Sequence, residues 1–162
     1  MGSVVYGPVP SWRLGKSLGV DLLSTSVKTC SFNCVYCQLG TTNNRLAERR
    51  EFVPLSQLAS ELEQVRDVDA DYVTFSGVGE PTLASNLGQA IDLARKILKL
   101  PVAVLTNSSL MPEEGVRRQL ALADVVVAKL DAPNEKLFHT VNRPVTTYGL
   151  DQIVLGLERF RL

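Results

Sequence analysis

The 162-residue sequence lacks the features of a membrane protein, a secreted protein or a protein that coats nucleic acid. No stretch approaches the roughly 18 consecutive apolar residues of a membrane-spanning helix, and the N-terminus lacks the basic and then apolar pattern of a signal peptide. Charge of neither sign is in excess, because 17 acidic side chains balance 17 basic ones. This balance gives no support to nucleic-acid binding by bulk electrostatics. We therefore expect a cytoplasmic protein that does not contact a membrane.

Cysteine is absent from the sequence outside one short segment. The three cysteines, Cys30, Cys34 and Cys37, fall within eight residues. An odd and tightly clustered set does not build a disulfide framework, and it favours metal ligation in a reducing compartment. The remaining composition, 45% hydrophobic and 21% charged, is that of a globular chain. We expect one domain over residues 1–162.

Hydrophobic patterning predicts an α/β fold. Apolar runs that read as strands alternate with stripes of helical spacing. The expected strands are residues 18–23, 72–75, 101–106 (from Pro101) and 125–130, and the expected helices are 55–65 (after Pro54), 87–98, 112–122 and 150–160. Four such alternations imply parallel strands joined by right-handed crossovers, hence a partial (β/α) barrel of about four β/α units.

Three local expectations accompany this pattern. Residues 7–11 read as a turn-rich lead-in, and residues 125–130 are apolar enough to be buried on both faces. Helix 112–122 would carry Leu120 and Leu122. The last helix has no glycine cap, so we expect the core domain to be incomplete at its C-terminal end.

The cysteine segment has the spacing C-x3-C-x2-C, which lets one loop present three thiolates to one inorganic cluster. Fe–S clusters usually have four cysteine ligands, so three ligands leave one iron of a [4Fe-4S] cluster open for another molecule. Two alternatives stay open. One is a structural zinc site that adds the lone His139 as fourth ligand, and the other is a cluster that only transfers electrons.

The loop resembles the signature of the radical S-adenosylmethionine (radical SAM) superfamily, including the aromatic Tyr36 before the last cysteine. The resemblance implies a [4Fe-4S] cluster on Cys30, Cys34 and Cys37 whose open iron binds S-adenosyl-L-methionine (AdoMet). Reductive cleavage would give methionine and a 5′-deoxyadenosyl radical that abstracts hydrogen from a substrate. Further segments, among them residues 7–11, 18–21, 28–30 and 76–82, look like an Fe–S oxidoreductase subgroup similar to wyosine-type tRNA-modifying enzymes.

The resemblance also implies a glycine-rich motif that binds the methionine amino group, and Gly77, Gly79 and Glu80 stand at that position. Two glycines allow close approach of backbone to ligand, and Glu80 has the charge to accept from an ammonium. The alternative is an ordinary strand-to-helix turn in which Glu80 precedes a helix opened by Pro81.

Other polar residues follow the predicted strands. Asn107 would contact the ribose or the carboxylate of AdoMet, or else it forms a turn. Lys129 and Asp131 would contact the ribose; alternatively, Lys129 is a lysine at a strand end whose ammonium extends to solvent. Tyr36 would lie beside the adenine; alternatively, its ring fills the cysteine loop as a hydrophobic side chain. Cluster chemistry implies an electron donor such as flavodoxin or ferredoxin. RNA, a protein side chain and a small metabolite all stay open as substrates.

Two basic segments carry less specific signals. Arg45, Arg49 and Arg50, interleaved with acidic residues, are typical of a solvated surface, with contact to a substrate phosphate as the alternative. Trp12 departs from the basic pair that the subgroup carries at this position, which weakens any transfer of substrate identity.

Overall fold

The computed structural model describes residues 2–161 and contains one five-stranded sheet of order β1-β2-β5-β6-β7. The last four strands in this order run parallel, and β1 pairs antiparallel with β2. The strands are β1 (Val5–Ser11), β2 (Gly15–Val20), β5 (Tyr72–Phe75), β6 (Val102–Thr106) and β7 (Val125–Ala128). The parallel strands match the four strands that the sequence predicts, with boundaries that differ by a few residues.

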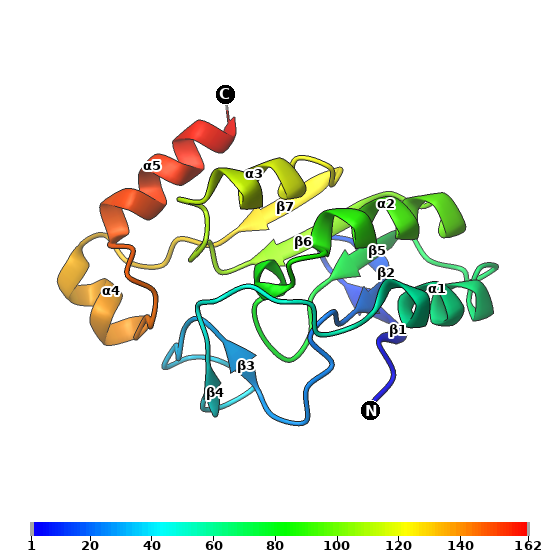
Figure 1. Ribbon diagram of the computed structural model, residues 1–162, viewed down its shortest axis with the longest axis horizontal. Coiled ribbons are helices and arrows are strands. Elements are labelled where there is room, and N and C mark those ends of the chain that lie inside the picture. The colour runs from blue at the N-terminus through cyan, green and yellow to red at the C-terminus, as the bar shows by residue number, and fades with distance from the viewer. Residues whose placement is uncertain (1, 162) are drawn as a thin grey trace.

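Helices α1 (Leu55–Gln64), α2 (Leu87–Leu98) and α3 (Glu114–Leu120) lie along one face of this sheet (Figure 1). A small parallel pair, β3 (Thr29–Cys30) and β4 (Asn44–Arg45), lies beyond the carboxyl ends of the parallel strands, where Thr29 contacts the residues after β5 (Figure 1). A short 3-10 helix, η1 (Pro81–Leu83), follows β5, and α4 (Glu135–Val141) and α5 (Leu150–Arg161) follow β7. Alternation of parallel strands with helices confirms the predicted α/β fold of about four β/α units.

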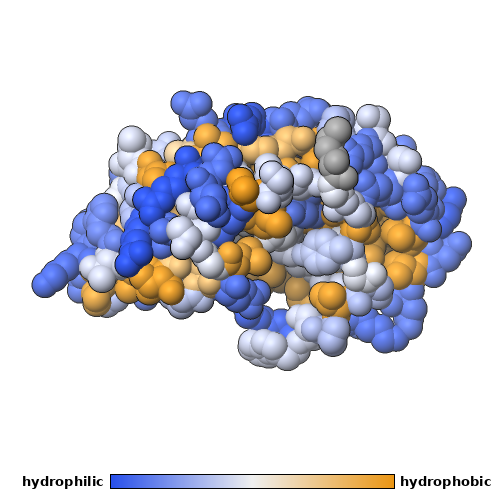
Figure 2. All heavy atoms as spheres, turned by 90° about the horizontal axis from the view of Figure 1, so that it is seen from below, coloured by the Kyte–Doolittle hydropathy of each residue, from blue (hydrophilic) through white to orange (hydrophobic). Residues whose placement is uncertain are grey.

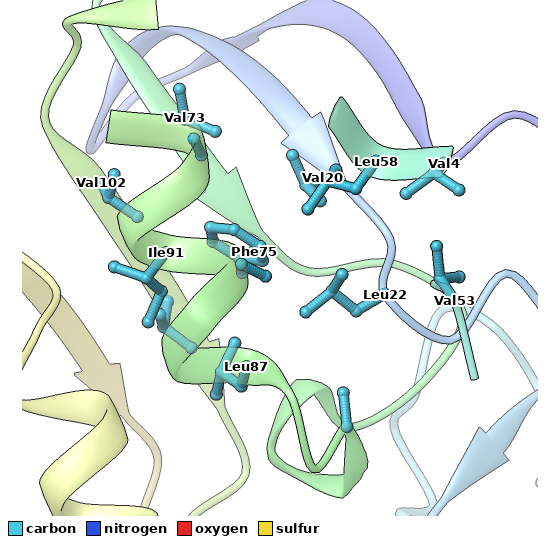
Figure 3. Close-up of a cluster of buried hydrophobic side chains, with 14 of the residues drawn as sticks. Val4, Val20, Leu22, Val53, Leu58, Val73, Phe75, Leu87, Ile91 and Val102 are labelled. Atoms are coloured by element: carbon cyan, nitrogen blue, oxygen red, sulfur yellow. The ribbon is translucent and has the colours of Figure 1, made fainter. Parts of the chain in front are cut away.

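The main hydrophobic core fills the space between the sheet and helices α1 and α2. Leu87 and Ile91 of α2 point toward Phe75 of β5, and Leu58 of α1 lies near Val20 of β2 (Figure 3). All five side chains are inaccessible to solvent. Burial of a side chain of this size contributes roughly 1.5–3 kcal/mol, so this layer fixes the sheet against its helices and thereby positions the strand ends.

The lead-in over residues 7–11 is a strand, and our expectation of a turn-rich segment was wrong there. Pro8 and Pro10 lie in β1, which is the edge of the sheet and pairs only with β2 among the described residues. Proline lacks an N–H, and an edge strand tolerates it because only one side of the strand needs hydrogen bonds. The prolines therefore mark an edge and do not end the strand.

Two further expectations need correction. The four residues of β7 are only half-buried, because β7 pairs with β6 alone among residues 2–161 and Val127 and Ala128 line a cavity. Leu122 lies beyond the end of α3 and is 39% exposed. Helix α4 was not predicted, although Asn134, whose side chain accepts from the Leu137 N–H at 3.0 Å, is a typical helix-capping residue.

Within residues 2–161 the longest helices have too few residues, and too little apolar character, to pass through a bilayer. Seen from below the view of Figure 1, the surface is hollowed near its middle, and hydrophobic and hydrophilic residues are interspersed across it (Figure 2).

Candidate functional site

A cavity of about 690 Å³ lies at the carboxyl ends of the parallel strands. Ser76, Thr106 and Lys129, which end or follow β5, β6 and β7, lie on its wall. Every predicted site residue except Asp131 lines it: Cys30, Cys34, Tyr36, Cys37, Gly77, Gly79, Glu80, Asn107 and Lys129. Ligands of parallel α/β sheets bind at this end of the strands, because the loops that follow the strands gather there.

The cysteine loop is held against the sheet by backbone hydrogen bonds on two sides. At one side the Thr29 N–H donates to the Val78 carbonyl at 3.1 Å, and the Glu80 N–H donates to the Thr29 carbonyl at 3.3 Å. At the other side the Asn33 N–H donates to the Asn142 carbonyl at 2.9 Å. The loop is therefore positioned by β5 and by the end of α4 together.

The three cysteines are free thiols in different surroundings. Cys30 is buried, and Cys34 and Cys37 are half-buried. Burial and the charge of Glu80 raise the pKa of Cys30 to about 11. Burial also acts to raise the pKa of Cys37, but a hydrogen bond and charge from Lys28 outweigh it, so that pKa lies below its ordinary value. A cationic neighbour of this kind favours thiolate, which is the form that binds metal.

The described residues do not form the zinc site with His139 that the sequence left open. In the described part of the chain, no three His, Cys, Asp or Glu side chains converge closely enough to hold one ion. His139 does not line the cavity and instead pairs with Glu135 on α4, with Nε2 3.1 Å from Oε1. The three free thiols that line one cavity have the donor chemistry of a [4Fe-4S] cluster, which would offer each thiolate its own iron.

The glycines of the predicted motif let two protein segments approach each other. A Cβ on Gly79 would lie 1.5 Å from the carbonyl oxygen of Thr29. Gly77 has φ +140°, and a Cβ there would lie 2.3 Å from the carboxyl carbon of Asp21. That carboxylate in turn accepts from the Val78 N–H at 3.1 Å. These glycines thus fix β3 and the end of β2 against the residues that follow β5, in addition to lining the cavity.

Glu80 is buried, and its carboxylate joins the ends of two strands. Oε1 accepts from the N–H of Thr82 at 3.1 Å, from its Oγ1 at 2.6 Å and from Thr106 Oγ1 at 2.7 Å. Oε2 accepts from the Asn107 N–H at 2.7 Å. Glu80 therefore caps η1, as the turn alternative expects, and it also positions Asn107. Burial raises its pKa against the opposing effect of these hydrogen bonds.

We expect Glu80→Gln to destabilise the protein by about 2 kcal/mol at low pH, because an amide nitrogen in place of Oε2 cannot accept from the Asn107 N–H. The raised folded pKa means that the contribution of Glu80 is complete below the unfolded pKa and is lost as pH rises through the folded pKa. The difference in the free energy of unfolding between wild type and Glu80→Gln, measured by urea unfolding, should therefore become smaller as pH rises.

Glu61→Gln is the matched control. Burial acts to raise the pKa of Glu61, but hydrogen bonds from Val5, Gln57 and Ser3 outweigh it and lower that pKa. The contribution of Glu61 to stability is therefore present above the unfolded pKa and is lost as pH falls through the folded pKa. The difference in the free energy of unfolding between Glu61→Gln and wild type should thus become larger as pH rises. A parallel pH dependence of the two variants would contradict the assigned environment of Glu80.

Asn107 contacts the cysteine loop directly. Its Nδ2 donates to Ser31 Oγ at 3.0 Å and to Cys30 Sγ at 3.4 Å, and its Oδ1 accepts from the Ser109 N–H at 2.9 Å. Ser31 and Ser109 also share a hydrogen bond of 2.6 Å between their hydroxyl oxygens. The loop after β6 and the cysteine loop are therefore one hydrogen-bonded unit.

Tyr36, Lys129 and Asp131 form a second group at the cavity edge. The Lys129 ammonium lies 4.1 Å from the centroid of the Tyr36 ring and 3.8 Å from Asp131 Oδ2. The Tyr36 hydroxyl donates to Asp131, and burial together with this hydrogen bond raises the pKa of Tyr36. The structure thus brings Tyr36, predicted beside the adenine, into contact with Lys129 and Asp131, predicted together at the ribose.

Asn142 is a residue of the site that sequence reasoning missed. It is buried, and its Nδ2 donates to Asp131 Oδ2 at 2.8 Å and to Cys34 Sγ at 3.4 Å. It follows α4 with no motif around it, and the cysteine that it contacts is 108 positions away. No local signal in the sequence marks this residue.

Arg45, Arg49 and Arg50 do not line the cavity. Arg49 donates to the carbonyls of Thr82 at 2.7 Å and Ala84 at 2.9 Å, so it holds η1 against the chain after β4. Trp12 is 89% exposed, and only its neighbour Arg13 lines the cavity. The guanidinium of Arg13 lies 4.7 Å from the centroid of the Trp12 ring.

Comparison with known proteins bears on the family and the fold. The family model described as Radical SAM superfamily matches residues 24–161. UPF0026 proteins of Synechocystis sp. and Methanocaldococcus jannaschii are 43% and 41% identical to the chain over 97% and 98% of its length, and the matches cover 59% and 50% of those proteins. The chain thus spans about half the length of these relatives. The solved structure of native anSMEcpe with bound AdoMet superposes with a TM-score of 0.64 at 19% identity, covering 90% of this chain and 40% of that one.

Proposed function

Because the chain belongs to the radical SAM superfamily, we propose that Cys30, Cys34 and Cys37 hold a [4Fe-4S] cluster and that the adjoining cavity binds AdoMet. The observation that supports this best is the single cavity whose wall carries all three free thiols together with the ends of three parallel strands. A cavity of about 690 Å³ lies within the range of roughly 300–1,000 Å³ that small-molecule sites occupy.

The residues around the cavity have distinct proposed roles. Gly79 keeps the backbone close to Thr29 beside the cysteine loop and Gly77 keeps it close to Asp21, and the backbone polar groups of both would face the amino acid part of AdoMet. Asn107, held by Glu80, faces the same region. Tyr36 supplies an aromatic wall for the adenine, and Lys129 and Asp131 supply polar contacts for the ribose. When bound, the cluster would supply the electron that cleaves AdoMet to methionine and a 5′-deoxyadenosyl radical.

Several parts of the proposal concern the whole protein. We propose that residues 1–162 form part of a radical SAM core domain, because the chain spans about half of its relatives. A one-electron donor such as flavodoxin or ferredoxin would reduce the cluster, in a reducing compartment such as the cytoplasm. The hydrogen-atom source is the substrate, for which RNA, a protein side chain and a small metabolite are the classes to test.

The deciding experiment is anaerobic reconstitution with iron and sulfide, using the chain at its natural length. We expect a brown protein whose visible spectrum changes on addition of AdoMet. Addition of dithionite should then release methionine and 5′-deoxyadenosine, and omission of dithionite is the control. Colourless protein with one bound zinc ion would instead support a structural module. A stable cluster that ignores AdoMet would support simple electron transfer.

A further inference from the structure

Two asparagine side chains direct N–H groups at two of the three cysteine sulfurs. Asn107 Nδ2 lies 3.4 Å from Cys30 Sγ, and Asn142 Nδ2 lies 3.4 Å from Cys34 Sγ. The two asparagines come from different elements, one after β6 and the other at the end of α4. This agreement in chemistry and distance indicates a common purpose for two residues far apart in the sequence.

Both amide groups are held in place by protein contacts. Asp131 Oδ2 accepts from Asn142 Nδ2 at 2.8 Å, and the second N–H of that amide lies between Cys34 Sγ at 3.4 Å and the Tyr36 hydroxyl oxygen at 3.3 Å. Asn107 is fixed at three points, since its backbone N–H donates to Glu80, its Oδ1 accepts from Ser109 and its Nδ2 donates to Ser31. Donors fixed in this way need no rearrangement when charge develops on the sulfurs.

We infer that Asn107 and Asn142 are positioning residues that set the reduction potential of a cluster bound to Cys30 and Cys34. Hydrogen bonds to ligand sulfurs stabilise the more negatively charged, reduced form and so raise the potential. Among residues 2–161 no asparagine amide donates to Cys37, and the cation that acts most strongly on it is Lys28, whose Nζ also donates to the Gly40 carbonyl at 2.7 Å. All three sulfurs thus face positive or hydrogen-donating groups of the chain.

The inference rests on the proposed function and is tested on the reconstituted chain at its natural length, without AdoMet. Dithionite with redox mediators supplies one electron per cluster, no bond to the protein forms or breaks, and electron paramagnetic resonance follows the reduced form. We expect Asn107→Ala and Asn142→Ala each to lower the equilibrium constant for reduction about tenfold, which is ~59 mV toward more negative potential. Asn107→Asp, which places a carboxylate beside Cys30, should shift the potential further in the same direction.

Asn86→Ala is the matched control, because Asn86 is also buried and its Nδ2 donates to the Val53 carbonyl at 2.9 Å. The reduction potential of the cluster in Asn86→Ala should equal that of wild type. Unchanged potentials in the Asn107 and Asn142 variants would overturn this inference and leave the proposed function intact. Loss of the cluster from both variants but not from the control would overturn it too, since the asparagines would then only maintain the fold. Failure of wild type to assemble a cluster would instead reject the proposed function.

Discussion

Cys34→Ala should reduce the iron content of the anaerobically reconstituted protein to background and abolish AdoMet cleavage. Each thiolate is proposed to bind a separate iron, and the chain has no cysteine outside the loop to replace a lost ligand. The fold itself should survive, because Cys34 is only half-buried and the contact that its thiol accepts from Asn142 is long, at 3.4 Å. The measurement combines iron and sulfide analysis with urea unfolding of the iron-free proteins.

Val35→Ala controls for disturbance of the loop. Val35 lies between Cys34 and Cys37, is 56% exposed and does not line the cavity. This variant should retain iron and cleavage activity near the wild-type level. Full iron incorporation by Cys34→Ala would contradict the proposed ligand set. Retention of one zinc ion by wild type, lost in Cys34→Ala, would support the structural zinc alternative in its place.

Gly79→Ala should destabilise the protein by about 3 kcal/mol, the upper end of the usual cost of overpacking. The new Cβ would lie 1.5 Å from the carbonyl oxygen of Thr29 and 2.6 Å from its carbonyl carbon, so backbone and not a flexible side chain must move. Displacement of Thr29 would break its hydrogen bonds to Val78 and Glu80. Urea unfolding measures the loss, and faster alkylation of the buried Cys30 would report that the cysteine loop has moved.

Gly115→Ala provides the opposite case in the same chain. Gly115 lies in α3, and a Cβ there would meet nothing within 4 Å. Alanine is more favourable than glycine by roughly 0.5–1 kcal/mol in a helix interior, and because Gly115 lies in the first turn of α3 the variant should gain only part of this stability over wild type. Equal stability of Gly79→Ala and wild type would show that β3 does not contact the residues after β5 as closely as described.

The elements that the sequence predicted correctly are those with a strong local period. The apolar spacing of α1, α2 and α5 and the continuous run of β6 recur within each segment, so a short window is enough to recognise them. The prolines of β1 misled the prediction because their tolerance depends on which strand lies at the edge of the sheet. Helix α4 was missed because its seven residues show no period and the prediction did not use its capping residue Asn134, whereas the equally short α3 was predicted over 112–122.

The sequence by itself determined the α/β class, the resemblance to the radical SAM superfamily and the trio of thiols, because each depends on residues close together in the chain. Only the tertiary structure decided that Glu80 holds Asn107 and that Asn142 reaches Cys34, contacts that join residues 27 and 108 positions apart. Contacts of this kind arise where parallel crossovers return strand ends to one edge of a sheet. Their partners are chosen by packing and leave no periodic signal in the sequence.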